Sequence, residues 1–207
     1  SYYDLLTADK GYELVASLSD LRAKAATHYF VLASDDADLL IGLHDAPNNG
    51  NKALFYEQPL SPLEDVSKLW MMEVDGEAFA LRHADYDGLL IQTEWDRPDQ
   101  MRTHDQPYAC EWTKLNFVYE DGAWMVENGK YPGNWLGLWT ESHGYQTGEE
   151  MACNKTIETR GHLQLFAISR ERYQNDYLEG ASMMEPKDAT LFVINPEFIG
   201  NGVGWTM

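Results

Sequence analysis

The stretch LNFVYEDGAWMV, residues 115–126, contains two apolar segments joined by an Asp-Gly turn. In the first segment Leu115 and Phe117 stand two residues apart, and in the second Trp124 and Val126 do the same. Side chains two residues apart share a face of a β-strand, so both segments are predicted strands. Asp-Gly between two such segments is a strong hairpin signal. We therefore predict a β-hairpin that turns at Asp121-Gly122.

Similar stretches recur along the chain at intervals of about 45 to 50 residues. The three copies run from Phe30 to Val74, from Phe79 to Glu120 and from Trp124 to Ile168. A second Asp-Gly turn, Asp75-Gly76, joins the first copy to the second. An internal repeat of this length predicts the architecture before any single motif is considered.

Each copy contains four predicted strands. The opening strands contain Phe30-Val31-Leu32, Phe79-Ala80-Leu81 and Trp124-Met125-Val126, and the second strands contain residues 39–43, 89–93 and 135–139. The third strands are predicted at residues 53–56, 109–112 and 152–155. In the closing strands the pairs Leu69/Met71, Leu115/Phe117 and Leu163/Leu165 are expected to face inward. Twelve short strands with turns at every junction suggest a closed barrel capped by hairpins.

This pattern resembles the β-trefoil family, in which each unit has an opening barrel strand, two cap strands and a closing strand. The resemblance covers about 145 of the 207 residues, and the Gln-x-Trp motif of the ricin-like branch is absent from the closing strands. It implies an all-β fold, a twelve-stranded pseudo-threefold β-trefoil at residues 28–172. An N-terminal helical arm (residues 1–27) and a C-terminal extension (residues 173–207) are predicted to flank it.

The two flanks have distinct patterns. Residues 13–24 have apolar side chains at positions 14, 15, 18 and 21, which predicts a helix covering one end of the barrel. Residues 189–196 form a short apolar strand candidate that ends at Pro196. This segment is expected to pack on the core or to form a homodimer contact.

Charge and hydropathy exclude several classes of partner. The formal net charge of -19 repels nucleic-acid phosphates and anionic lipids, so neither nucleic acid nor membrane insertion is expected. The sequence has no apolar run of transmembrane length and no signal-peptide pattern at its start. The seven Trp and twelve Tyr suit both a small β-barrel core and a surface that stacks on sugar rings.

The two cysteines, Cys110 and Cys153, occupy the same predicted strand position in different copies. Equivalent positions away from a threefold axis lie too far apart for a disulfide, so we expect two small buried hydrophobic side chains. Unpaired thiols favour a cytoplasmic or non-classically secreted protein.

The sequence contains no motif typical of catalysis. Nucleophile-elbow, zinc-protease, Cys-x-x-Cys and phosphate-loop patterns are absent, and the six histidines lack metal-ligand spacing. The acidic turns at residues 35–38 and 85–88 contain oxygen ligands of the kind that Ca²⁺ prefers, but they lack a complete calcium-loop spacing. Solvated turn carboxylates are the favoured interpretation. No enzyme activity, metal or cofactor is expected.

Polar and aromatic side chains gather in corresponding loops of the three copies. A sugar site needs an aromatic face that stacks on the pyranose, and carboxylates or amides that bond adjacent hydroxyls. The candidate ligand-binding residues are Asp85, Asp87, Trp95 and Asp96 in the second copy, Asn134, Trp139, Glu141 and His143 in the third, and His44, Asp45 and Asn48 in the first. Copies two and three are favoured over copy one as the locations of the sugar sites. Ordinary polar loops with packed aromatic residues are the alternative.

The resemblance implies a non-enzymatic carbohydrate-binding protein, a lectin or agglutinin, whose partners are glycans or glycoproteins. The alternative is a β-trefoil protease inhibitor similar to the mycocypin or Kunitz inhibitors, with residues 96–107 as the inhibitory loop. A fascin-like scaffold without ligand chemistry is a third possibility.

Overall fold

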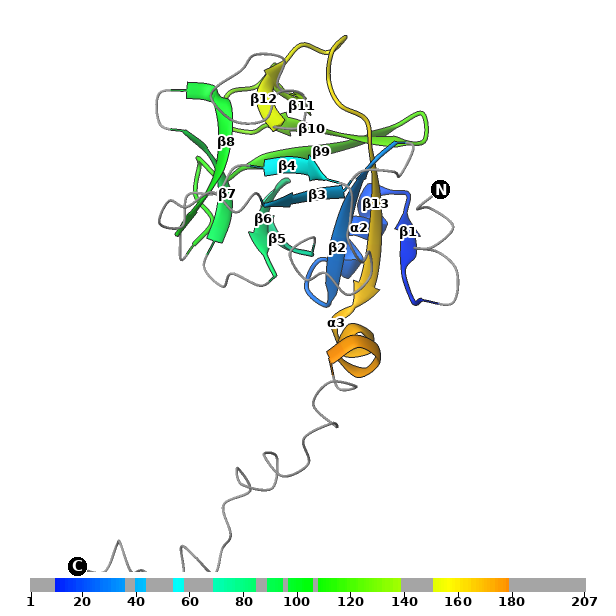
Figure 1. Ribbon diagram of the computed structural model, residues 1–207. Helices are drawn as coiled ribbons and strands as arrows, with labels where there is room; N and C mark the ends of the chain where they lie inside the picture. Colours follow the sequence, from blue (N-terminus) through cyan, green and yellow to red (C-terminus); the bar gives the residue numbers. More distant parts are fainter. Residues whose placement is uncertain are drawn as a thin grey trace, which may run out of the picture. The chain divides into compact units, whose positions relative to one another are not determined.

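The structure is a computed structural model that describes residues 10–35, 40–43, 54–57, 69–84, 89–94, 97–105, 108–138 and 151–178. The described residues are mostly β-strand, and thirteen strands among them form one connected sheet (Figure 1). The chain divides into two compact units, residues 1–170 and residues 171–207. The sheet belongs to the first unit.

Twelve of the strands follow one another in three groups of four. The first group contains β2 (His28–Ser34), β3 (Leu40–Leu43), β4 (Leu54–Glu57) and β5 (Trp70–Asp75). The second contains β6 (Ala78–His83), β7 (Leu89–Glu94), β8 (Arg97–Asp105) and β9 (Leu115–Glu120). The third contains β10 (Ala123–Asn128), β11 (Trp135–Leu138), β12 (Met151–Lys155) and β13 (Leu163–Ser169).

The first and last strands of the groups pair antiparallel in a closed cycle, which we call the six-strand ring. β2 pairs with β5, β5 with β6, β6 with β9, β9 with β10, β10 with β13, and β13 with β2. The other six strands form the hairpins β3–β4, β7–β8 and β11–β12, each joined to the opening strand of its own group. The hairpins also meet one another, because β12 pairs with β8. Closure gives every ring strand a partner on both sides.

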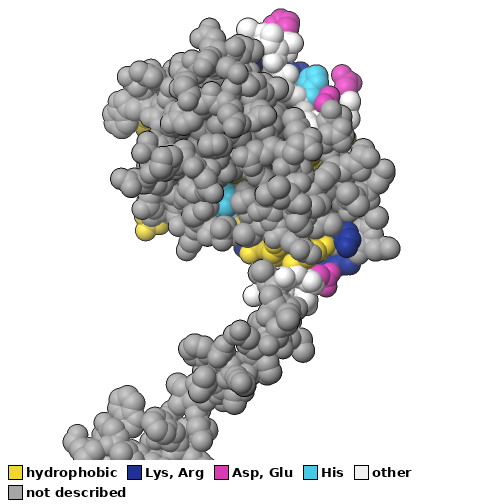
Figure 2. Space-filling model, viewed as in Figure 1, with side chains coloured by type: hydrophobic (Ala, Val, Ile, Leu, Met, Phe, Trp, Pro, Cys, Tyr) yellow, Lys and Arg dark blue, Asp and Glu magenta, His cyan; other side chains and the backbone are white. Residues whose placement is uncertain are grey.

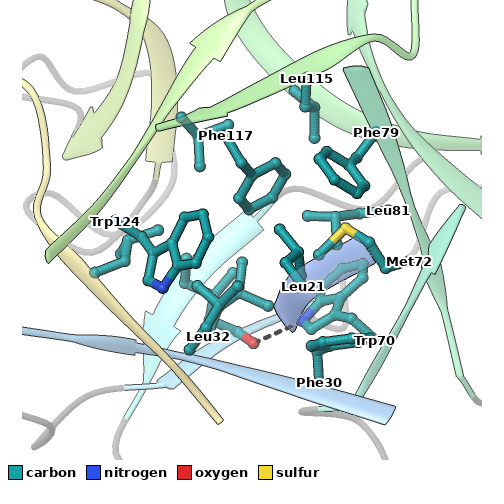
Figure 3. Close-up of a cluster of buried hydrophobic side chains, with 14 of the residues drawn as sticks. Leu21, Phe30, Leu32, Trp70, Met72, Phe79, Leu81, Leu115, Phe117 and Trp124 are labelled. Carbon is teal, nitrogen blue, oxygen red and sulfur yellow. Dashed lines mark hydrogen bonds between the residues drawn. The ribbon is translucent and has the colours of Figure 1, made fainter. Parts of the chain in front are cut away.

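Each ring strand places two core side chains, two residues apart, inside the ring. They are Phe30 and Leu32, Trp70 and Met72, Phe79 and Leu81, Leu115 and Phe117, Trp124 and Val126, and Leu163 and Leu165, all at most 5% exposed. The strand register pairs Phe30 with Trp70, Phe79 with Leu115, and Trp124 with Leu163 within groups. It pairs Met72 with Leu81, Phe117 with Val126, and Leu165 with Leu32 between groups. Figure 3 shows the members of this set that it labels, among them Phe30, Trp70, Phe79, Phe117 and Trp124, pointing toward one another.

The two bulkiest fully buried side chains among the described residues, Trp70 and Trp124, combine apolar packing with a satisfied polar atom. The Trp70 indole donates to the Ile41 carbonyl oxygen at 3.1 Å, the bond drawn dashed in Figure 3. The Trp124 indole donates to the Val15 carbonyl oxygen at 2.7 Å. Each bond links the core to a segment outside the ring, so these residues also fix the position of β3 and of the chain before β2.

Two tight turns join the groups at the predicted places. At β9–β10 the turn residues are Asp121 and Gly122, with φ angles of 51° and 79°, as a type I′ hairpin requires. At β5–β6 the strand includes Asp75, so the turn residues are Gly76 and Glu77. Gly76 has a φ of 63°, which fits the first position of a type II′ turn.

The predicted helix over residues 13–24 is wrong in its first half. Residues Glu13–Val15 form strand β1, which pairs with β13, and helix α2 spans Leu18–Lys24. Ser17 ends the extended segment and caps the helix, because its hydroxyl accepts from the Asp20 backbone amide at 3.1 Å. Leu21 of α2 is fully buried in the core, where Figure 3 shows it beside Trp70.

Two strand predictions in the repeat need correction. The third strand of the second copy is β8 at Arg97–Asp105, and residues 108–114 are irregular or turn. The predicted inhibitory loop at residues 96–107 is therefore largely a strand. In the first closing strand Trp70 and Met72 occupy the core, whereas Met71 is only half-buried. Leu69–Met72 is apolar at every position, so alternation alone does not define the inward face.

The cysteines are not structurally equivalent, contrary to the prediction. Cys153 is buried on β12, while Cys110 is half-exposed in the irregular segment before β9. Burial, with a further effect of the nearby Glu127 carboxylate, raises the pKa of the Cys153 thiol. The unfolded chain therefore loses this proton first, so stability is fully present below about pH 8.5 and decreases as the pH rises above that value.

A short helical segment begins at Arg170, the last residue of the first unit, and its other residues belong to the second unit. α3 (Arg170–Tyr173) continues into a π-helical turn, η2 (Gln174–Leu178). Arg172 forms an ion pair with Asp176 at 3.0 Å, and the Tyr173 and Tyr177 rings stack at 5.1 Å. None of the helices in these described parts is long and apolar enough to span a membrane. The predicted strand and dimer contact at residues 189–196 lie outside the described residues.

Replacing Trp124 with Phe tests the bond that fixes β1. The Val15 carbonyl loses its indole donor, and we expect the free energy of unfolding to fall by about 1–3 kcal/mol in chemical denaturation. Amide exchange should accelerate at Glu13–Val15. Trp70→Phe is the matched variant, because it removes the corresponding indole bond to Ile41. It should leave the amide exchange rates of β1 unchanged. Equal exchange at β1 in both variants would contradict this role of Trp124.

Thiol titration tests the different environments of the cysteines. In the native protein we expect a disulfide-type thiol reagent to modify one cysteine rapidly, Cys110, because only that side chain is partly exposed. Cys153 should react only after denaturation. A Cys110→Ala variant should therefore show almost no rapid reaction in the native state, and rapid modification of that variant would show that Cys153 is accessible.

Candidate functional site

The turn that joins β10 to β11, residues 129–134, is the one predicted ligand loop whose contacts the structure describes. It begins at Gly129, whose backbone amide donates to the Lys114 carbonyl oxygen at 2.9 Å. A Cβ atom at residue 129 would lie 2.6 Å from the Lys114 Cβ and 2.9 Å from its carbonyl oxygen. Only glycine permits this close approach. The turn is thereby held against the segment that precedes β9.

Side chains at the end of β10 fix the shape of this turn. Asn128 is fully buried, and its side-chain oxygen accepts from the Lys130 amide at 2.9 Å and from the Tyr131 amide at 3.0 Å. The Glu127 carboxylate accepts from the Gly133 amide at 3.2 Å and from the Asn116 side chain at 3.1 Å. Together with the bonded amides of Gly129 and Asn134, these bonds give every backbone N–H group of the turn a partner, so the turn is a defined platform for its side chains.

Asn134 is the only predicted site residue among those that the structure describes. Its side-chain amide donates to the Tyr131 carbonyl oxygen at 3.0 Å, and its backbone carbonyl accepts from the Asn128 amide at 2.8 Å. Asn134 therefore helps to close the turn. The other predicted residues lie outside the described part of the chain, which leaves their grouping a prediction: His44, Asp45, Asn48, Asp85, Asp87, Trp95, Asp96, Trp139, Glu141 and His143.

The segment before β9 brings a tryptophan to this turn. The Trp112 and Tyr131 rings lie 6.1 Å apart between centroids, tilted by 60°. The Lys130 ammonium lies 4.6 Å from the centroid of the Trp112 ring and 2.6 Å from the Glu111 carboxylate. We call the four residues Glu111, Trp112, Lys130 and Tyr131 the Trp112 patch. Trp112, Lys130 and Tyr131 are half-buried, and Glu111 is exposed.

Thr113 explains why Trp112 lies in a turn instead of a strand. Its hydroxyl donates to the Cys110 carbonyl oxygen at 3.0 Å and accepts from the Cys110 amide at 2.9 Å. These bonds fold the chain back before β9. The sequence prediction placed residues 109–112 in a strand and omitted Trp112 from the site. A threonine three residues after Cys110 and two before Leu115, the first residue of the closing strand, is the sequence feature that indicates the turn.

The Trp112 patch combines two kinds of recognition chemistry. Half-buried aromatic rings offer apolar surface that can cover one side of a flat ligand. The Lys130–Glu111 ion pair is partly solvated, and such pairs contribute little stability, so both groups can exchange partners at small cost. An ammonium donor beside a carboxylate acceptor suits a ligand with adjacent hydroxyl groups.

Acidic residues do not assemble into a metal site among the residues that the structure describes. No group of three or more His, Cys, Asp or Glu side chains there is arranged to hold a metal ion. The described surface is also mixed in charge. Figure 2 shows acidic, basic and hydrophobic side chains on the face that it views. The net charge of -19 therefore does not describe every part of the surface.

Comparison with known proteins gives a likeness in fold and none in sequence. No protein-family model matches the sequence, and no curated protein matches it. Among solved structures, a mosquitocidal holotoxin matches with a TM-score of 0.54 at 10% identity. The match covers 67% of this chain and 17% of the holotoxin chain, so this chain corresponds to a small part of the toxin.

Two further solved structures indicate the kind of fold. The designed threefold-symmetric β-trefoil ThreeFoil matches with a TM-score of 0.52 at 10% identity, over 66% of this chain and 96% of the designed one. A Polyporus squamosus lectin, solved with the influenza-binding epitope Neu5Acα2-6Galβ1-4GlcNAc, matches with a TM-score of 0.51 at 14% identity. That match covers 68% of this chain and 48% of the lectin chain. The fold of this mostly β chain is therefore trefoil-like and similar to that of a lectin.

Proposed function

We propose that this protein is a non-enzymatic lectin that binds glycans through the Trp112 patch. The supporting observation is the patch itself, in which two aromatic rings lie beside a carboxylate and an ammonium group on a rigid turn. The fold likeness to a glycan-bound lectin agrees with this proposal. In the proposed complex the apolar face of a pyranose covers the aromatic rings, and Glu111 and Lys130 bond its hydroxyls.

The proposed fold is a complete β-trefoil, in which the six-strand ring is the barrel and the three hairpins are its cap. The cyclic pairing of the ring strands and the pairing of β12 with β8 support this interpretation. In such a fold the Trp112 patch lies where the second group of strands meets the third. Further sites at Trp95 and Asp96, between β7 and β8 in the sequence, and at Trp139 and Glu141, between β11 and β12, remain part of the proposal.

Rigidity is the physical basis for choosing the Trp112 patch. A weak sugar site gains affinity when its groups lose little freedom on binding. The turn is already ordered by Asn128, Glu127 and Asn134, and Trp112 is held by the Thr113 turn. Single sites of this kind bind weakly, and avidity from several sites on one chain or one assembly raises the affinity. Neutral glycans are the favoured ligands because the protein has a net charge of -19.

A glycan array followed by calorimetric titration of the best binder tests this proposal. In Tyr131→Ala and Trp112→Ala we expect the association constant to fall by at least about tenfold, because each removes an aromatic stacking surface. Glu111→Gln should weaken binding less, since the amide still accepts a hydrogen bond. Glu77→Gln is the matched control, because Glu77 is also an exposed partner of a cation, Arg22, and should leave affinity unchanged.

Other results would contradict the proposal at different levels. If Trp95→Ala and Trp139→Ala abolish binding while Tyr131→Ala does not, the protein is a lectin that uses other loops. If no glycan on a broad array binds, the lectin function is wrong. Denaturation curves of all variants separate a loss of binding from a loss of folding.

A further inference from the structure

A pocket of about 420 Å³ lies away from the Trp112 patch, beside strand β5 and the C-terminal end of α2. Its apolar lining comes from Ala25, Ala26, Met71, Met72 and Val74. Val74 is 51% exposed, which is unusual for a large apolar side chain on a strand of this ring. A volume of this size lies in the range typical of small-molecule sites.

The apolar lining suits a ligand of variable shape. Met71 is half-buried on β5, Met72 also packs in the core, and methionine side chains adapt to irregular surfaces because they are unbranched and polarisable. Ala25 and Ala26 leave space where the chain leaves α2. An apolar body of six to ten carbon atoms, roughly, fits such a surface without requiring polar partners.

Three charged side chains complete the lining, and two of them neutralise each other. The Arg82 guanidinium donates through Nε to the Glu73 carboxylate across the β5–β6 hairpin. That pair contributes no net charge to the pocket. Arg170 is the third, and no carboxylate partner of its side chain is found among the described residues. The pocket therefore has a net positive charge from a single arginine.

Arg170 is fixed in position but incompletely bonded. Its backbone amide donates to the Thr27 carbonyl oxygen at 3.0 Å, and its guanidinium lies 5.5 Å from the centroid of the Tyr29 ring. The Nε–H group is buried and has no hydrogen-bond partner among the described residues. Burial of an unpaired donor is unfavourable, so the hydrogen-bonding capacity of the Arg170 side chain is not fully satisfied by the described residues.

We propose that this pocket binds a small monocarboxylate with an apolar body. The planar guanidinium of Arg170 offers the fork of donors that a carboxylate accepts. The apolar body of the ligand lies against Met71, Val74 and Ala26. A sugar would leave its hydroxyls unpaired on this lining, and a cation would be repelled by Arg170. This site is independent of the proposed glycan site and has a different ligand class.

The experiment uses the full chain labelled at its methionine methyl groups and NMR titration with 4-phenylbutanoate. We expect saturable shifts of the Met71 and Met72 signals, which Met71→Leu and Met72→Leu variants assign. The uncharged probe 4-phenylbutanamide has the same apolar body and should bind at least about tenfold more weakly, because it lacks the charge that Arg170 recognises.

Variants identify Arg170 as the recognition group. Arg170→Gln should reduce the affinity for 4-phenylbutanoate to that for the amide, and Arg170→Lys should retain part of the difference. The matched control is Arg160→Gln, because Arg160 also has a buried Nε without a partner in the described part but pairs with Glu120 and stacks on Trp135, outside the pocket. It should leave binding unchanged. Val74→Glu alters a half-exposed position and should abolish carboxylate binding by repulsion.

Three results would overturn the proposal. The first is an absence of saturable shifts at both methionines. The second is equal affinity for the carboxylate and the amide, which would mean an apolar pocket without anion recognition. The third is an equal loss of affinity in Arg160→Gln and Arg170→Gln, which would mean an effect of overall charge.

Discussion

Closure of the six-strand ring is the constraint on which the rest of the structure depends. A strand in a closed ring has one face inside, so two side chains from each strand must fill a fixed space. Phe30, Trp70 and Trp124 provide bulk, while Leu81, Val126 and Leu163 fit between them. The six ring strands together place twelve side chains in the core, and each of the twelve has a cross-strand partner. A change in the register of one strand would therefore move its apolar residues out of the core.

Strands with apolar residues in the repeated pattern could be predicted from the sequence, and a mostly polar strand could not. The β9–β10 hairpin was predicted correctly because Leu115 and Phe117 alternate with Asn116 and the Asp121-Gly122 pair marks the turn before the apolar residues 123–126. β8 was missed because Arg97–Asp105 contains Pro98 and mostly polar residues. Its strand arises from pairing with β7 and β12, which is tertiary information.

The candidate site also contains one part that the sequence predicted and another that depends on tertiary contacts. Sequence reasoning identified residues 130–134 as the polar turn between the first two strands of the third copy, and Asn134 does lie there. It missed Trp112, because the ring reaches Tyr131 only when β9 and β10 pair and Gly129 contacts Lys114. Neither contact is visible in a local pattern. The pocket beside β5 was equally hidden, because Ala25, Val74 and Arg170 are far apart in the sequence and meet only in the folded unit.

The pairing of β13 with both β1 and β2 has a consequence for how the chain is made. β2 ends at residue 34, but its partner β13 begins at residue 163. During synthesis the early strands therefore wait, with open edges and exposed apolar side chains, until nearly the whole first unit has left the ribosome. Native contacts of such high sequence separation form slowly. For this protein we therefore expect the nascent chain, more than the finished fold, to be the state most exposed to aggregation.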